Sequence, residues 1–156
     1  MTLKNKNRLT AILTIAYLVS CSCINYKKET KIFEKYLNDN FNKCIEQQRH
    51  FYLLSNSYVC KNCISYYLAI LDSSMMNANN KNITIITTID LPGLERLKSK
   101  TNFLKDNLGQ LNYENLNLNN LTIFYTEYGK IVDITYLPLD KEKENRYKLN
   151  QIVKNN

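Results

Sequence analysis

The chain has 156 residues, with 21 Lys and Arg against 14 Asp and Glu, and 44% of its residues are apolar. This length suits one compact domain, and 22% charged with 11% aromatic residues excludes a disordered chain or a small disulfide scaffold. The formal net charge is +7, but the basic residues are scattered among acidic ones without an Arg-rich stripe, so we expect no nucleic-acid partner.

Residues 1–20 have the layout of a signal peptide. Three basic residues precede the apolar run 9–19, which is about half the roughly 20 residues that a membrane-spanning helix needs. Leu18-Val19-Ser20-Cys21 follows and resembles the lipobox of bacterial lipoproteins. The resemblance implies cleavage before Cys21 and acylation of that residue. The alternative is an ordinary secretory signal in which Cys21 is incidental.

We therefore expect a protein of the bacterial cell envelope that is held to a membrane by lipid on Cys21 and faces the periplasm or the exterior. Residues 21–40 are predicted to be a tether and residues 41–156 the folded domain. Cys23, beside the anchor, is interpreted as an unpaired thiol. The tether ends in a helical stretch whose apolar residues have the spacing to pack on the domain's edge, namely Ile32, Phe33, Tyr36, Leu37 and Phe41.

The first half of the domain shows a strand, a helix and a second strand. The short apolar run 51–54 predicts a buried strand. After Cys60, apolar residues recur at i, i+3, i+4, i+7 and i+11, which predicts a helix with one buried face, formed by Ile64, Tyr67, Leu68, Leu71 and Met75. The β-branched run 83–89 predicts a central parallel strand.

The second half is predicted to contain a helix, a hairpin and a closing helix. The helix enters at 90–93 and includes Phe103 and Leu104 on its apolar side. Segments 121–125 and 131–136 form the hairpin, since Gly129 between them can take a left-handed conformation. Asp140 is the expected N-cap of the last helix. The order β-α-β-α-β-β-α predicts an α/β fold, with a mixed sheet of about four strands and helices on both faces.

The motif that carries chemistry is Cys60-Lys61-Asn62-Cys63, between the first strand and the first helix. Backbone N–H groups at a helix start stabilise an anion, so we expect a lowered pKa and nucleophilic character at Cys60. Cys63 lies one turn further in, shielded and placed to attack a mixed disulfide. The alternatives are a static disulfide and a zinc site, although Cys44 and His50 are the only other soft donors of the domain.

Four further side chains carry weaker predictions. We expect Cys44 to be a buried apolar residue and His50 to lie at the surface. Tyr67 belongs to the predicted core. A place for Tyr66 at the rim of the active surface is the less favoured interpretation of that residue. No metal and no cofactor are expected.

The order strand, Cys-x-x-Cys, helix, strand, helix, hairpin, helix resembles the thioredoxin fold over about residues 48–154. Together with the lipobox, it resembles membrane-tethered thiol–disulfide oxidoreductases of the peroxiredoxin-like, TlpA-type branch. The stretch 120–132 is similar to that family's hairpin, which ends in Gly-Lys-Ile, as at Gly129-Lys130-Ile131. The resemblance implies a thioredoxin-like fold and exchange with protein thiols and disulfides of the envelope, with Cys60 and Cys63 as the catalytic pair.

Three positions depart from the family's pattern. The family's cis-proline, which helps to grip the substrate, falls at Leu121. The usual Trp before the first cysteine is Val59, with Tyr58 beside it, and the first strand has no buried acid. The resemblance thus implies substrate binding by Leu121 and Tyr58. The competing hypothesis is a non-catalytic binding or accessory lipoprotein of the same fold, with Cys60 and Cys63 as a structural disulfide.

Overall fold

The computed structural model describes ten helices and strands of the chain. Their order is α2 (Lys27–Phe41), β1 (His50–Ser55), α3 (Lys61–Ser74), β2 (Ile83–Thr87), α4 (Glu95–Lys100), β3 (Asn102–Lys105), the 3-10 helix η1 (Gln110–Asn112), β4 (Leu121–Glu127), β5 (Lys130–Tyr136) and α5 (Glu142–Lys154). The residues described are 26–55, 60–75, 81–90, 93, 95–112, 115–116, 118, 121–138 and 140–154. The predictions for Cys21, Cys23 and Tyr58 lie outside them.

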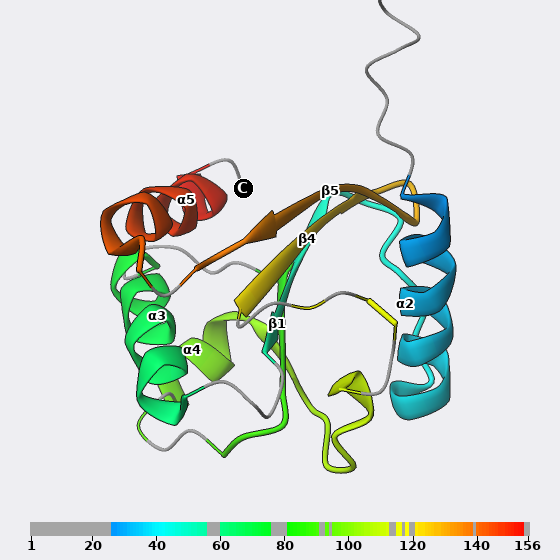
Figure 1. The fold of residues 1–156 in the computed structure, drawn as a ribbon, viewed down its shortest axis with the longest axis horizontal. Coiled ribbons are helices and arrows are strands. Elements are labelled where there is room, and N and C mark those ends of the chain that lie inside the picture. Colours follow the sequence, from blue (N-terminus) through cyan, green and yellow to red (C-terminus); the bar gives the residue numbers. More distant parts are fainter. Residues whose placement is uncertain are drawn as a thin grey trace, which may run out of the picture.

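Five strands form one mixed sheet in the order β3-β2-β1-β4-β5. Strand β2 is parallel to both β1 and β3, whereas β4 is antiparallel to both β1 and β5. Figure 1 shows α2 on one side of the sheet and α3, α4 and α5 on the other. The predicted α/β fold, with a mixed sheet flanked by helices, is confirmed, and the sheet has five strands instead of about four.

The two faces of β1 explain why the sheet is covered on both sides. Tyr52 and Leu54 belong to the cluster under α2, and Leu53 belongs to the cluster under α3 and α5, as the two-residue period of a strand requires. Both clusters are built of large apolar side chains. A strand buried on both faces reads as a continuous apolar run, which is why 51–54 carries no polar residue.

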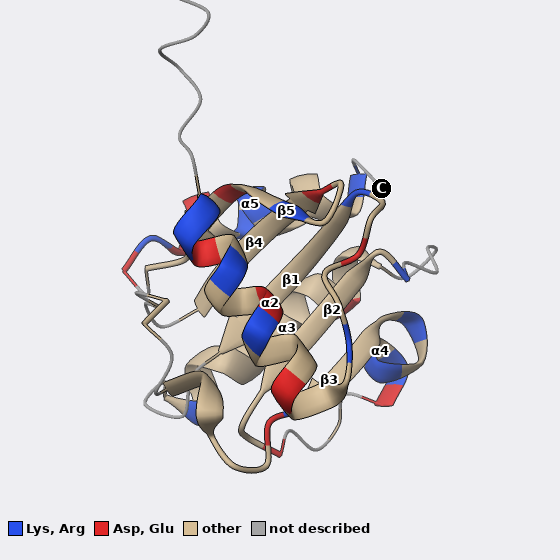
Figure 2. Cartoon of the chain, turned by 90° about the vertical axis from the view of Figure 1, so that its right-hand side faces the viewer, with Lys and Arg blue, Asp and Glu red and all other residues tan. Residues whose placement is uncertain are grey.

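Helix α2 is packed against the sheet, although most of it falls in the range 21–40 predicted as a tether. Phe33 and Tyr36 are fully buried, and the Phe33 ring meets those of Tyr52 and Phe124 edge-on at 4.9 and 5.0 Å between centroids. Thr30 Oγ1 accepts a hydrogen bond of 3.1 Å from the backbone N–H of Ile131 in β5. The outer side of α2 carries Lys, Glu and Asp side by side (Figure 2). The helix is therefore amphipathic, with its apolar stripe on the domain's core.

The prediction that the second helix continues through Phe103 and Leu104 is wrong. Helix α4 stops at Lys100, and residues 102–105 form the edge strand β3 beside β2. Phe103 packs on the cluster under α3 and α5, while Leu104 packs on the cluster under α2. Neighbouring apolar residues that point to opposite faces suit a strand, and the pairing partner that decides the matter is nearly 20 residues away.

Two further predictions are wrong. His50 is not a surface residue, because it is only 3% exposed and its Nε2 lies 2.7 Å from Thr84 Oγ1. As the first residue of β1, it shares the inward direction of Tyr52, and their ring centroids are 4.6 Å apart. Cys44 is exposed rather than buried, because it lies in the connection between α2 and β1.

Candidate functional site

The candidate site lies at the edge of the sheet where β1 ends and β4 begins. Ser55, the last residue of β1, is paired with Thr87 in β2 and with Leu121 in β4. Cys60 follows as the N-cap of α3, and its carbonyl accepts the N–H groups of Cys63 at 3.0 Å and Ile64 at 3.1 Å. The motif therefore sits on the first turn of the helix, where the sequence predicted it.

The buried face of α3 determines how far each thiol is exposed. Ile64, Tyr67 and Leu68 are at most 2% exposed and fix the helix against the sheet. Cys60 precedes this face and is exposed, whereas Cys63 lies beside it, half-buried against the same apolar cluster. Both are free thiols in the structure. One thiol is thus open to solvent, and the second lies half-buried on the same turn.

The two thiols differ in pKa, in opposite directions. The pKa of Cys60 is lowered, mainly by the hydrogen bond from the Cys63 thiol, with the backbone N–H groups of Cys63 and Asn62 adding to the effect. The pKa of Cys63 is raised, first by that hydrogen bond with Cys60 and then by partial burial. Since a thiolate is the nucleophile, the exposed sulfur is the one prepared to react.

A hollow of about 300 Å³ opens beside Cys63, between α3 and the start of α5. Its walls are Asn62, Cys63, Tyr66, Tyr67 and Glu142. Tyr67 is buried, as its core assignment predicted, while Tyr66 is 38% exposed. The position of Tyr66 in the hollow beside Cys63 therefore supports the less favoured interpretation, in which Tyr66 lies at the rim of the active surface.

Leu121 lies at the same sheet edge as the start of α3, but its side chain is 1% exposed. Its carbonyl accepts the N–H of Leu137 at 2.9 Å. No cis peptide bond occurs among the residues that the structure describes, and Asn120 and Tyr58 lie outside them. The Leu121 side chain is therefore not exposed, and the prediction that Leu121 binds a substrate stays a prediction.

Nothing in the sequence indicated that Glu142, Asn145 and Arg146 would lie near the motif. Tyr66 donates a hydrogen bond to Glu142 and accepts one of 3.1 Å from Arg146. Asn145 is fully buried and donates through Nδ2 to the Tyr67 hydroxyl at 2.9 Å. Each pair is more than 70 residues apart in sequence, so only the packing of α5 on α3 reveals them.

Within the described ranges, no three His, Cys, Asp or Glu side chains gather closely enough to hold a metal ion. Nor does any described helix have the length and apolar character needed to cross a bilayer.

No protein-family model matches the chain, and no curated protein matches it. Among solved structures, the chain is similar to the crystal structure of a Chlorobium tepidum protein described as a thiol:disulfide interchange protein, DsbE. The sequences are 12% identical, the match covers 67% of this chain and 80% of the other, and the TM-score is 0.37. The similarity is distant.

Proposed function

We propose that this protein is a thiol–disulfide oxidoreductase in which Cys60 attacks a partner and Cys63 resolves the mixed disulfide. The observation that carries the proposal is the division between the two thiols. Cys60 is exposed at a helix start with a lowered pKa, and Cys63 is half-buried on the same turn with a raised pKa. A permanent structural disulfide has no need of such a difference.

The reaction follows from that arrangement. The Cys60 thiolate attacks one sulfur of a partner's disulfide, the partner's S–S bond breaks, and the released sulfur leaves as a thiolate that takes up a proton. Cys63 then loses its proton and attacks the Cys60 sulfur of the mixed disulfide. The second partner sulfur leaves, and a Cys60–Cys63 disulfide remains. Two electrons have passed from the dithiol to the partner, and the reverse sequence oxidises a partner dithiol.

Trapping the mixed disulfide tests this chemistry. In Cys63→Ser, the resolving sulfur is missing, so we expect a partner joined covalently through Cys60 in a band that disappears on reduction. Cys60→Ser is the matched control and should trap nothing, because the sulfur that it retains is half-buried. If Cys63→Ser traps no partner and Cys60 does not react with maleimide after mild reduction, the chain is a non-catalytic module of the same fold.

A reduction potential separates an exchanging pair from a permanent bridge. Structural disulfides have potentials below about −300 mV, whereas catalytic ones are more oxidising. We expect the Cys60–Cys63 couple to lie above that limit, since the lowered pKa of Cys60 stabilises the reduced form. A potential well below the limit would favour the structural bridge.

We further propose that lipid on Cys21 anchors the domain to a membrane of the cell envelope, where its partners are protein thiols and disulfides. The support is the sequence Leu18-Val19-Ser20-Cys21 after a basic and apolar leader. Intact mass and detergent-phase partition test the anchor. Cys21→Ser should lose the acyl mass and move to the aqueous phase, whereas Cys23→Ser should keep both properties.

A further inference from the structure

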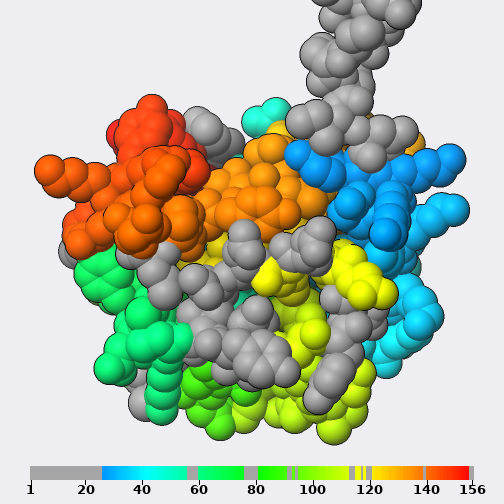
Figure 3. Space-filling view, viewed as in Figure 1, coloured from blue at the N-terminus to red at the C-terminus, as the bar shows by residue number. Residues whose placement is uncertain are grey.

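We infer that the hollow between α3 and α5 binds an uncharged apolar side chain that lies next to the reacting cysteine of the partner protein. The inference deepens the proposed function and rests on it. The hollow begins at Cys63 and is lined by the rings of Tyr66 and Tyr67, so whatever occupies it lies beside the dithiol. Figure 3 shows the surfaces of α3 and α5 adjoining on one side of the molecule.

The two tyrosines form a fixed aromatic wall. Their rings are edge-on, with centroids 5.4 Å apart and an interplanar angle of 68°. Tyr67 is held by Asn145, whose Nδ2 also donates to the Pro138 carbonyl. Tyr66 is 38% exposed, which leaves part of its ring free for contact. Large, well-held aromatic side chains bind apolar groups at little entropic cost.

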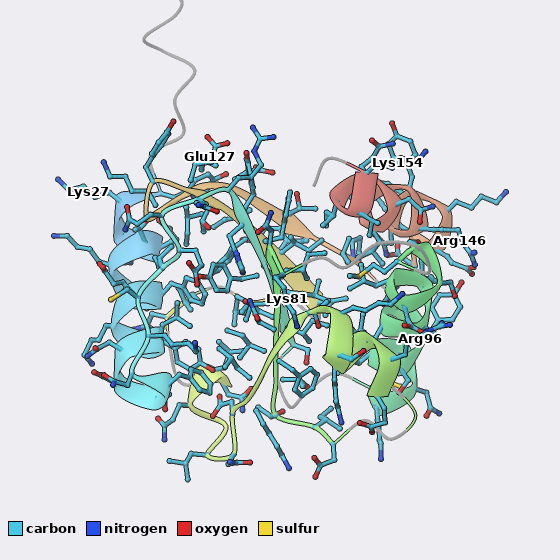
Figure 4. The ribbon with its side chains drawn as sticks, turned by 180° about the vertical axis from the view of Figure 1, so that it is seen from behind. Lys27, Lys81, Arg96, Glu127, Arg146 and Lys154 are labelled. Carbon is cyan, nitrogen blue, oxygen red and sulfur yellow. The ribbon has the colours of Figure 1, made fainter. Side chains whose placement is uncertain are left out.

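The charges at the hollow are neutralised within the protein. The Tyr66 hydroxyl donates to Glu142 and accepts from Arg146, and an Arg146 nitrogen lies 3.6 Å from the Glu142 carboxylate. Figure 4 shows Arg146 beside α3. Because this carboxylate and guanidinium already face each other, the wall offers a charged ligand no unpaired opposite charge. An apolar side chain gives up no hydrogen bonds to water when it enters the hollow, whereas a charged side chain loses its hydration without compensation.

The spacing of Cys60 and Cys63 along α3 assigns the occupant to the partner segment that carries the reacting cysteine. Cys60 and Cys63 are three residues apart on one helix, about 4.5 Å along its axis. When the partner's sulfur is joined to Cys60, a neighbouring residue of an extended segment lies about 3.3 Å further along the chain, within reach of the hollow. On the Leu121 side, the side chain is buried and the carbonyl is occupied. Among the described residues, the hollow that adjoins Cys63 is the one between α3 and α5.

Model peptides test the inference. Two symmetrical peptide disulfides would be offered to the Cys63→Ser variant, one with Leu on each side of its cysteine and one with Ser. We expect the Leu peptide to form the Cys60 adduct about tenfold faster, the effect of one well-packed apolar contact. A third peptide with Glu in those places should react no faster than the Ser peptide.

Variants of Tyr66 identify the wall as the cause. Tyr66→Ala should abolish the preference for Leu, whereas Tyr66→Phe keeps the ring and should retain it. Tyr147→Ala is the matched control, since Tyr147 lies on α5, is 65% exposed and does not line the hollow. Reaction of each variant with 2-hydroxyethyl disulfide, which is small and uncharged, shows that Cys60 is still intact.

Equal rates for the three peptides, or a preference that survives Tyr66→Ala, would overturn the inference. If 2-hydroxyethyl disulfide still reacts at Cys60 in that case, the proposed function stands and only the docking surface is wrong. If Cys60 reacts with no disulfide at all, the proposed function itself fails.

Discussion

The ionisable groups near the two ends of strand β1 have pKa values that are shifted in opposite senses, toward the neutral form at one end and toward the charged form beyond the other. At the first end, burial lowers the pKa of His50 to about 4 and raises that of Tyr52 to about 12, so both are kept neutral. Beyond the other end, the pKa of Cys60 is lowered and its charged form is favoured. The side chains of His50 and Tyr52 are each only 3% exposed, whereas the Cys60 thiol is exposed.

This difference shows where the fold can tolerate a charge. The His50 ring has the Thr84 hydroxyl as a polar neighbour, and Tyr52 accepts one backbone N–H from Glu46, but at both residues the loss of water on burial has the larger effect, so ionisation there is unfavourable. At the start of α3, backbone N–H groups and a thiol donor replace the water. Strand β1 therefore begins at a buried polar pair, His50 and Thr84, and the chain that follows its other end leads to the exposed thiol of Cys60.

The largest effect is expected from removing the reactive thiol. Cys60→Ser should reduce disulfide exchange to the background rate, because a serine hydroxyl is not ionised at neutral pH and cannot form the mixed disulfide. Cys44→Ser is the matched control, since Cys44 is equally an exposed free thiol but has no second cysteine on its turn. Reduction of a protein disulfide, followed over time, measures both. Activity that survives Cys60→Ser, or that is lost with Cys44→Ser, would break the comparison.

His50 should make the protein less stable in mild acid. In the unfolded chain its pKa is close to 6.5, and in the folded protein it is about 4. As the pH falls from 6.5 to 4, the unfolded state binds a proton that the folded state does not, so stability decreases, by up to about 3 kcal/mol. Above pH 6.5 both states are neutral at this residue and the effect is absent.

His50→Gln supplies the comparison for that prediction. Urea unfolding at several pH values should show the free-energy difference between wild type and variant changing over this range, with no change above it. Carboxyl groups that titrate near pH 4 are present in both proteins and cancel in the difference. Two parallel curves would mean that His50 is charged in the folded protein or is not buried.

The smallest effect is expected at Tyr52. Its hydroxyl accepts a hydrogen bond of 3.0 Å from the backbone N–H of Glu46, so Tyr52→Phe should lower the free energy of unfolding by about 1 kcal/mol. Tyr128→Phe is the control and should change nothing measurable, because Tyr128 is 81% exposed. If Tyr128→Phe lowers the free energy of unfolding as much as Tyr52→Phe does, the hydrogen bond between Glu46 and Tyr52 does not stabilise the fold.

The parts of the fold that the sequence predicted are those set by local patterns. The helical spacing from Ile64 to Met75 corresponds to residues that are all buried in the structure. The hairpin was found at Gly129, whose φ is +70°, a conformation suited to glycine. The place of Cys60 at the start of α3 follows from the same spacing. These features depend on residues within one or two turns of each other.

The errors come from contacts between distant segments. Residues 102–105 became a strand because β2 pairs with them, and nothing in that short stretch shows the pairing. His50 is inside because its ring lies against Thr84 on β2 and against the ring of Tyr52. The alternation His50, Tyr52, Leu54 was a usable signal, since every second residue of a strand faces the same way. For Glu142 and Arg146 beside Tyr66, the sequence held no such signal.

The most direct test of the central claim is the pH dependence of alkylation at each thiol of the reduced protein. Trypsin cuts after Lys61 and so separates Cys60 from Cys63, which lets mass spectrometry follow each cysteine by its own peptide. We predict that Cys60 reaches half-maximal reactivity below the pH of a free cysteine, about 8.5, and Cys63 above it. A Cys60 that ionises at or above that pH, or a Cys63 that ionises first, would contradict the account.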